Sequence, residues 1–296
     1  MKALSTPAGD QANKVRTSSG ELPGLVIVPL MLAALYYPTF VWMYNAWNET
    51  DSNYSHGFWV PLVIAYFVWE KRDIFLAIPR NEDSRGFFWL GLGLFMHLSG
   101  LILDINFLSG LSLIPLAWGL ILWYAGKYAW KESLWPSIFI LFMVPLPYIS
   151  EEFRAFLQLK SAELSEIVFR ILGFNVIREG VTMDLGSFKL FVEAPCSGLN
   201  TVLSLVFVGS VVAYLAKGAW WRKVTLLLFA PIIAVAANVL RIVIIGLLGE
   251  FYGQEVAMGV FHKGSGMIMY AVGLTLFLLL AWALKVKLVS VEGMSK

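Results

Sequence analysis

Eight long apolar stretches constrain the fold of this chain more than any other feature. The sequence of 296 residues is 58% hydrophobic and 14% charged, which is far outside the range of ordinary soluble domains. A hydrocarbon core of about 30 Å requires about 20 apolar residues in each helix that crosses it. The stretches run roughly over residues 24–44, 57–69, 86–103, 107–125, 133–149, 197–216, 224–248 and 264–284. We therefore predict an all-α polytopic membrane protein with about eight transmembrane helices.

The positive charges predict the orientation of these spans, because cytoplasmic loops retain Lys and Arg. Of the 22 such residues, 15 fall on one side of the predicted spans: Lys2, Lys14, Arg16, Lys71, Arg72, Arg80, Arg85, Lys127, Lys131, Lys217, Arg222, Lys223, Lys285, Lys287 and Lys296. Only Lys263 falls on the short connections of the other side. Both termini are therefore predicted to be cytoplasmic. The net charge of +2 reflects this asymmetry and indicates no nucleic-acid partner.

The two ends of the chain set the domain boundaries that we expect. Residues 1–23 are rich in Ser, Thr, Gly, Pro and Lys, which is typical of a disordered tail. The polar start and the lack of a small-residue cleavage site predict that the first span is a retained anchor. Residues 24–290 are expected to form a single transmembrane domain.

Segment 148–195 is the only sizeable part of the chain outside the spans and is predicted to face the outside. Between residues 151 and 172 apolar side chains recur at a helical period, with charged residues between them. This pattern predicts an outer amphipathic helix in the membrane interface. Residues 176–192 alternate at period two around Leu185-Gly186, which predicts a small β-hairpin between helices 5 and 6. Two interpretations stay open: a connector, or a substrate-docking element directly before the cysteine of the chain.

Cys196 is the only cysteine and lies in the run Glu193-Ala-Pro-Cys-Ser-Gly-Leu-Asn200. A cysteine in an apolar stretch is usually a small core residue. Pro195, however, fits a first helical turn, where free N–H groups and the helix dipole favour a thiolate. Ser197 and Gly198 leave little bulk beside the sulfur, so a peptide carbonyl can approach it. A single cysteine excludes an intramolecular disulfide and a dithiol mechanism.

Arg241 is a charged residue inside a predicted span. It lies about 26 Å of helical rise past the cytoplasmic start of that span, at the outer edge of the hydrocarbon. A charge in a span costs about 2.5 to 3.5 kcal/mol on insertion scales and is functional by default, although snorkelling to the headgroups is the alternative. Residues Ala230, Ala234, Ala237, Asn238 and Arg241 share one helical face, which favours close approach of a neighbouring helix. Asn238 is one turn from Arg241 and is a candidate to hold its guanidinium.

Two histidines fall on the predicted outer side. His262 begins the last span, level with Cys196 and Arg241. A lone interfacial histidine is more often solvated, yet histidine is best suited to move a proton near neutral pH. His56, in an outer loop without Lys or Arg, either lines the same cavity or caps the next helix. The stretch that follows it reaches span length only if residues 54–56 join its first turn.

The chemistry suggests a division of labour among these groups. Arg241 would stabilise the thiolate of Cys196 or the oxyanion that forms when sulfur attacks a carbonyl. His262 would protonate the leaving amine and then deprotonate the incoming nucleophile. We assign supporting or substrate-binding roles to Asn238, Glu193, Ser197 and His56. The His and Glu residues show no metal-ligand spacing and no phosphate-binding glycine motif occurs, so neither metal nor cofactor is predicted.

These motifs together resemble the exosortase and archaeosortase family of membrane cysteine transpeptidases. The resemblance rests on Glu-Ala-Pro-Cys-Ser-Gly-Leu at 193–199, Asn-Val-Leu-Arg at 238–241 and His262 in the next outer loop. The run Tyr-Ser-His-Gly-Phe-Trp-Val-Pro at 54–61, followed by Trp-Glu-Lys-Arg at 69–72, is similar to the Ser-His-Gly motif of the bacterial exosortase branch. The resemblance covers about residues 25–285. The proline after Ala194 departs from the commoner Glu-Ala-Cys form.

The resemblance implies Cys196 as nucleophile, with Arg241 and His262 as its catalytic partners. It implies substrates that are exported proteins carrying a C-terminal sorting signal: a short motif such as Pro-Glu-Pro (a PEP-CTERM-like signal), a membrane helix and a basic cluster. Cleavage would occur on the outer, periplasmic face of the bacterial inner membrane, and the new carboxyl end would pass to an acceptor. Such enzymes are often found in organisms that make exopolysaccharide.

Two other functions stay open on the sequence alone. One is a multi-spanning transporter in which Arg241 binds an anionic substrate. The other is a thiol-dependent lipid acyltransferase that carries an acyl group on Cys196. A transporter would keep most of its activity after Cys196→Ala, whereas both thiol mechanisms require the cysteine.

Overall fold

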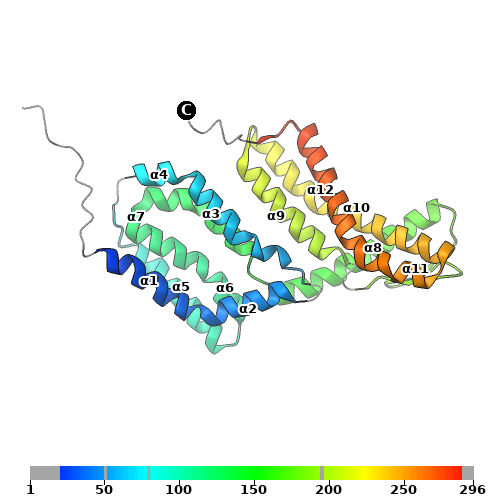
Figure 1. The fold of residues 1–296 in the computed structure, drawn as a ribbon, viewed down its shortest axis with the longest axis horizontal. Helices are drawn as coiled ribbons and strands as arrows, with labels where there is room; N and C mark the ends of the chain where they lie inside the picture. Colours follow the sequence, from blue (N-terminus) through cyan, green and yellow to red (C-terminus); the bar gives the residue numbers. More distant parts are fainter. Residues whose placement is uncertain (1–20, 50–51, 79–80, 194–196, 289–296) are drawn as a thin grey trace, which may run out of the picture. The chain divides into compact units, whose positions relative to one another are not determined.

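The computed structural model describes residues 21–49, 52–78, 81–193 and 197–288 and is 78% helical (Figure 1). Residues 1–20 of the tail predicted over residues 1–23 lie outside the described residues, as does the proposed nucleophile, Cys196. The chain forms two compact units, residues 1–42 and 43–296. The first contains α1 (Glu21–Leu35) and the start of α2 (Tyr37–Asn48), where the rings of Tyr36 and Phe40 pack 6.3 Å apart.

Within the second unit, the helices that follow α2 pack closely through glycine. These elements are η1 (Ser55–Phe58), α3 (Val60–Glu70), α4 (Arg72–Ala77), α5 (Gly86–Ile102), α6 (Asn106–Leu111), α7 (Leu113–Ile138) and η2 (Phe139–Phe142). A Cβ atom on Gly86 would lie 2.6 Å from the backbone N of Trp123, and one on Gly93 would lie 2.9 Å from that of Leu116. The bare backbone of α5 therefore lies directly against α7, as small residues allow between membrane helices.

Gly126 divides α7 into two helices. Its backbone angles, φ 83° and ψ −177°, are not helical. The rings of Trp118 and Trp130 lie 6.4 Å apart, whereas twelve residues of straight helix would rise about 18 Å. The chain thus reverses at Gly126, and its second arm packs against α3 through Phe139 and Phe67, whose rings are 4.9 Å apart. The two predicted stretches 107–125 and 133–149 correspond to these two arms.

The segment predicted to face the outside contains the predicted amphipathic helix, α8 (Pro147–Ile171), and a small sheet. The sheet has the order β1-β2-β3, from β1 (Ile177–Glu179), β2 (Thr182–Asp184) and β3 (Lys189–Phe191). The turn at Leu185-Gly186 joins β2 to β3 as predicted. A second reversal at Gly180, with φ 62°, adds β1 and extends the predicted hairpin to three antiparallel strands.

The C-terminal helices lie side by side (Figure 1). They are α9 (Leu199–Leu215), α10 (Trp220–Tyr252), α11 (Gln254–Met258) and α12 (Val260–Ala283), with a short β4 (Ala216–Lys217) paired to β5 (Lys287–Leu288). Ala230, Ala234 and Ala237 of α10 are fully or almost fully buried. A Cβ atom on Gly273 of α12 would lie 3.6 Å from that of Ala237. The predicted small face of α10 is therefore a close helix contact.

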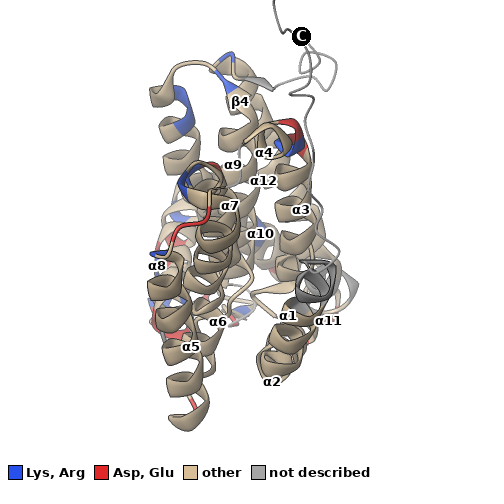
Figure 2. Cartoon of the chain, turned by 90° about the vertical axis from the view of Figure 1, so that its left-hand side faces the viewer, with Lys and Arg blue, Asp and Glu red and all other residues tan. Residues whose placement is uncertain are grey.

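In the described part of the chain, three helical segments are long and apolar enough to cross a membrane: Asn106–Phe142, which the reversal at Gly126 divides into two arms, Trp220–Tyr252 and Gly264–Ala283. Shorter apolar helices run over Gly86–Ile102 and Leu199–Leu215. Figure 2 shows charged residues at helix ends and along α8, while most of the length of α5 and α12 carries none. The fold is thus that of an all-α membrane protein with a small three-stranded sheet. Helix α3, with 11 residues, is the shortest of the expected spans.

Candidate functional site

Arg241 on α10 is held against the first turns of α12. Its Nε–H donates a hydrogen bond to the Oγ atom of Ser265 at 2.8 Å. A Cβ atom on Gly266 would lie 3.9 Å from the Cζ, Nη1 and Nη2 atoms of the same guanidinium. Equal distances to these three atoms mean that the flat face of the guanidinium covers the glycine. The sequence analysis missed Ser265 and Gly266, although their spacing from His262 was a usable signal.

His262 belongs to this same part of α12, and the structure describes its backbone but not its side chain. Residues three apart occupy one face of a helix, so positions 262 and 265 share a face. Since Ser265 is bonded to Arg241, position 262 of α12 lies within one helical turn of the residue that binds the arginine. The sequence expectation that the two residues lie at one depth is compatible with this arrangement.

The turn that follows Cys196 rests on Asn238. Gly198 has a left-handed backbone with φ 82°, and a Cβ atom there would lie 2.9 Å from Cγ of Asn238. The Nδ2 atom of Asn238 donates to Oγ of Ser161 on α8 at 3.1 Å, and both residues are buried. Asn238 therefore links the turn to α8, one helical turn from Arg241. Ser161 was not anticipated from the sequence.

Helix α9 begins at Leu199, three residues after Cys196. The prediction that Cys196 lies in the first turn of a helix concerns a residue outside the described ones, and in the described chain the left-handed Gly198 directly precedes α9. Ser197 is buried, and its Oγ accepts a hydrogen bond from the backbone N of Leu199 at 3.3 Å. Glu193 ends the described chain before the cysteine and is half-buried.

His56 lies in η1, is 7% exposed and packs against Phe207 of α9 with ring centroids 5.7 Å apart. The N-cap of α3 is Trp59, so His56 does not cap that helix. Nearby, Tyr54 accepts a hydrogen bond at its hydroxyl from the backbone N of Leu146 at 3.1 Å. The outer loop is thus packed on α9 and on the segment that leads into α8.

The three-stranded sheet packs on the C-terminal half of α10. Its buried residues form one hydrophobic cluster with α8, α10 and α11: Ala162, Phe169, Val176, Met183, Leu185, Phe188, Leu190, Val192, Val239, Ile242, Val243, Ile245 and Ala257. A Cβ atom on Gly249 would lie 2.3 Å from Phe188, and one on Gly246 would lie 2.4 Å from Phe169. Ring atoms therefore touch the bare backbone of α10. Arg241 lies on this helix between Val239 and Ile242 of the cluster, one turn after Ala237 of the contact with α12.

Charged residues also fix the sheet to α8. Glu166 accepts a hydrogen bond from Nε of Arg178 in β1 at 2.6 Å and another from Nη2 of Arg170 at 2.8 Å. Arg178, and then Arg170, hold the pKa of Glu166 below its ordinary value. The backbone N–H of Gly186 and the ammonium of Lys189 likewise lower the pKa of Asp184 in the sheet.

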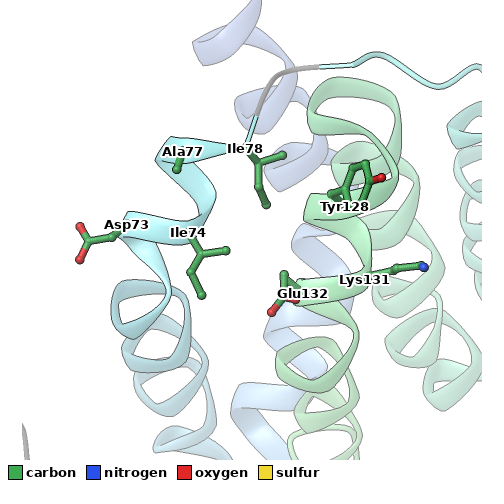
Figure 3. A pocket seen from close by; sticks show the side chains of 7 residues that line it. All are labelled: Asp73, Ile74, Ala77, Ile78, Tyr128, Lys131 and Glu132. Atoms are coloured by element: carbon green, nitrogen blue, oxygen red, sulfur yellow. The ribbon is translucent and has the colours of Figure 1, made fainter. Parts of the chain in front are cut away.

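A cavity of about 690 Å³ lies elsewhere, between α4 and the second arm of α7 (Figure 3). It is lined by Asp73, Ile74, Ala77, Ile78, Tyr128, Lys131 and Glu132. In the close-up the side chains of Asp73 and Lys131 point away from one another at its two sides. None of the candidate site residues contributes to its lining.

Among the residues that the structure describes, no group of three His, Cys, Asp or Glu side chains is placed to hold a metal ion. The described contacts instead bring together an arginine, a helix position that bears a histidine, and the turn that follows a cysteine. Such an arrangement suits stabilisation of an anion or an oxyanion near a nucleophile.

The chain is an all-α membrane protein in which the small sheet, α8 and α12 all contact α10. The family model for transmembrane exosortases matches residues 47–279, and the chain belongs to this family, a family of cysteine transpeptidases. No curated protein and no solved structure gives a match. The match begins before η1 and ends within α12, so it includes Cys196, Arg241 and His262.

Proposed function

We propose that this protein is a membrane-embedded cysteine protease and transpeptidase. It cleaves the C-terminal sorting signal of exported proteins and transfers the new carboxyl end to an acceptor. The observation that carries this proposal is the contact of Arg241 with Ser265, since it joins the arginine of α10 to the helix that bears His262. Membership of the exosortase family supports the same activity.

In the proposed reaction, the thiolate of Cys196 attacks the carbonyl carbon of the scissile peptide bond. Arg241 stabilises the negative charge that develops on the carbonyl oxygen. The C–N bond breaks as the imidazolium of His262 gives its proton to the leaving amine, and a thioester remains on the sulfur. The imidazole then takes a proton from the acceptor nucleophile, which attacks the thioester and releases the thiolate.

The contacts around the turn support a fixed position for the nucleophile. Gly198 packs on Asn238, Asn238 is bonded to Ser161, and Arg241 follows one helical turn later. Glu193, Ser197 and His56 complete the proposed support, with Ser197 and His56 buried. Neither a metal nor a cofactor takes part in the proposed chemistry.

The proposed substrates are exported proteins that carry a recognition motif, a membrane helix and a basic cluster. Diffusion in the bilayer would bring the peptide beside the substrate helix to the depth of Arg241. Basic residues after that helix keep its end cytoplasmic, so the cut falls on the outer face. We place the enzyme in the bacterial inner membrane as a single transmembrane domain over residues 24–290, with both termini cytoplasmic and a periplasmic site.

The test follows an exported protein with such a tail in cells that carry wild type, Cys196→Ala or Arg241→Ala. The proposal is supported if wild type removes the tail and both variants leave it attached. Mass spectrometry of the trapped enzyme then identifies the adduct on Cys196. A peptidyl thioester supports the transpeptidase, whereas a fatty-acyl thioester indicates a lipid acyltransferase. Equal tail removal in wild type and Cys196→Ala would refute a thiol mechanism and leave transport through Arg241 as the alternative.

A further inference from the structure

The strand that leads toward Cys196 is an edge strand. In the order β1-β2-β3, one side of β3 is paired with β2, and no strand pairs with its other side among the described residues. The N–H of Val192 donates to the carbonyl of Val181 at 3.0 Å, and the N–H of Leu185 donates to the carbonyl of Phe188 at 3.0 Å. In an antiparallel pair the residues alternate between those that exchange hydrogen bonds with the partner and those that point away from it.

This alternation assigns the direction of each backbone group along β3. Residues 188, 190 and 192 face β2, so the N–H and C=O groups of Lys189 and Phe191 face outward from the sheet. No hydrogen bond to these four groups occurs among the described residues. Both residues are exposed, and the side chain of Phe191 is 53% exposed. The edge therefore offers two donors and two acceptors at alternate positions.

The edge is rigid and close in sequence to the proposed nucleophile. Leu190, between the two exposed residues, is buried in the cluster that packs on α10. Gln158 of α8 donates from Nε2 to the carbonyl of Val192 just after the strand. Cys196 is five positions after Phe191, and an extended chain of that length spans at most about 17 Å. In an extended peptide paired with β3, the residue that reaches Cys196 would lie about five positions from the residue opposite Phe191.

We infer that β3 is the docking edge for the substrate, and that the segment of the exported protein before its membrane helix adds to the sheet as a fourth strand. Backbone groups recognise an extended polypeptide whatever its side chains, which is the chemistry of strand addition. This inference rests on the proposed function. It gives the outer sheet the docking role that the sequence left open beside a connector role.

Cysteine cross-linking in membranes tests the docking edge in full-length protein. Lys189→Cys and Phe191→Cys are each combined with Cys196→Ala, so that the introduced thiol is the only one. The partner is an exported substrate with a single cysteine moved through successive positions before its membrane helix. Side chains directly opposite on paired strands have Cβ atoms about 4.5–5.5 Å apart, so we expect disulfides at alternate substrate positions. The register should shift by two positions between the two variants.

Thr182→Cys is the matched control, because its side chain shares the outer face of the sheet but lies on the central strand. It should cross-link weakly at every substrate position. Equal cross-linking at all positions, none with either edge variant, or a product that joins two copies of this chain would overturn the inference. The cross-linking result can be separated from the proposed function. If the alternating pattern is absent but tail removal still requires Cys196, the docking edge is refuted and the proposed function is not.

A kinetic measurement complements the cross-linking. Phe191→Pro removes the outward N–H without breaking a bond to β2, and proline is tolerated on edge strands. We expect it to raise KM about fivefold relative to Phe191→Ala, the size expected for loss of one net backbone hydrogen bond. Thermal unfolding in detergent should be similar for the two variants. Equal KM values would show that the outward donor contributes nothing to binding.

Discussion

The Nε–H of Arg241 donates to the Oγ of Ser265 across the contact of α10 with α12. This bond uses the edge of the guanidinium nearest its own side chain, and Gly266 lies against its flat face. A guanidinium held on one edge and one face has few orientations left. We therefore treat Ser265 as a positioning residue that acts through Arg241.

Replacement of Ser265 should separate orientation from binding. We expect Ser265→Ala to lower kcat for tail cleavage about tenfold, because a hydrogen bond to a charged group contributes about 1.5 kcal/mol or more. KM should change little. Ser265→Thr keeps the hydroxyl and should restore most of the rate. If alanine and threonine at this position behave alike, the hydroxyl does not orient the arginine.

Gly198 should be far less tolerant of alanine than a comparable glycine elsewhere. Gly198→Ala combines a left-handed backbone with a Cβ atom 2.9 Å from Asn238, whereas Gly173 has φ 90° and open space around it. Gly173→Ala should cost about 1 kcal/mol of unfolding free energy and keep activity. Gly198→Ala should cost more and lose tail cleavage. Thermal unfolding in detergent and cleavage in cells measure the two effects, and similar behaviour of both variants would contradict the packing of the turn on Asn238.

The depressed pKa of Glu166 predicts how the outer segment responds to acid. A carboxyl whose folded pKa lies below its unfolded value stabilises the fold at pH above about 4.3, and this contribution is lost as the pH falls through the folded pKa. The free energy of unfolding of wild type should exceed that of Glu166→Gln by at most about 1 kcal/mol near neutral pH, as is usual for partly exposed ion pairs. This difference should disappear at acidic pH. Limited proteolysis of the outer segment across pH provides the measurement, and a constant difference would argue against the pairing with Arg178.

Gly126 should be essential to the reversal within α7. Its φ is 83°, and a Cβ atom there would lie 2.1 Å from the backbone O of Asn81. Gly126→Ala should therefore destabilise the protein by at least about 2 kcal/mol. Gly91→Ala on α5 meets open space and should be neutral or slightly stabilising, since alanine favours helix over glycine. Thermal unfolding followed by circular dichroism compares the pair, and equal midpoints would mean that the turn tolerates a side chain.

The large features of the fold could be predicted because their signals are local. Apolar runs of span length, the helical period of 151–172 and the alternation of 176–192 each depend on neighbouring residues. The third strand was missed because it depends on the positive φ of Gly180, which composition does not reveal. Helix α9 begins two residues after the start of the predicted stretch 197–216, because Gly198 has a positive φ that the sequence pattern did not reveal.

The sequence by itself determined the membrane class, the family motifs and which residues could carry chemistry. Hydrophobic transfer and residue type are properties of the chain, and they do not depend on the fold. Only the tertiary structure decided that Arg241 meets Ser265, that Asn238 bonds to Ser161 and that β3 presents an open edge. These partners are 24 and 77 residues apart along the chain, and such contacts arise from helix packing that no local pattern encodes.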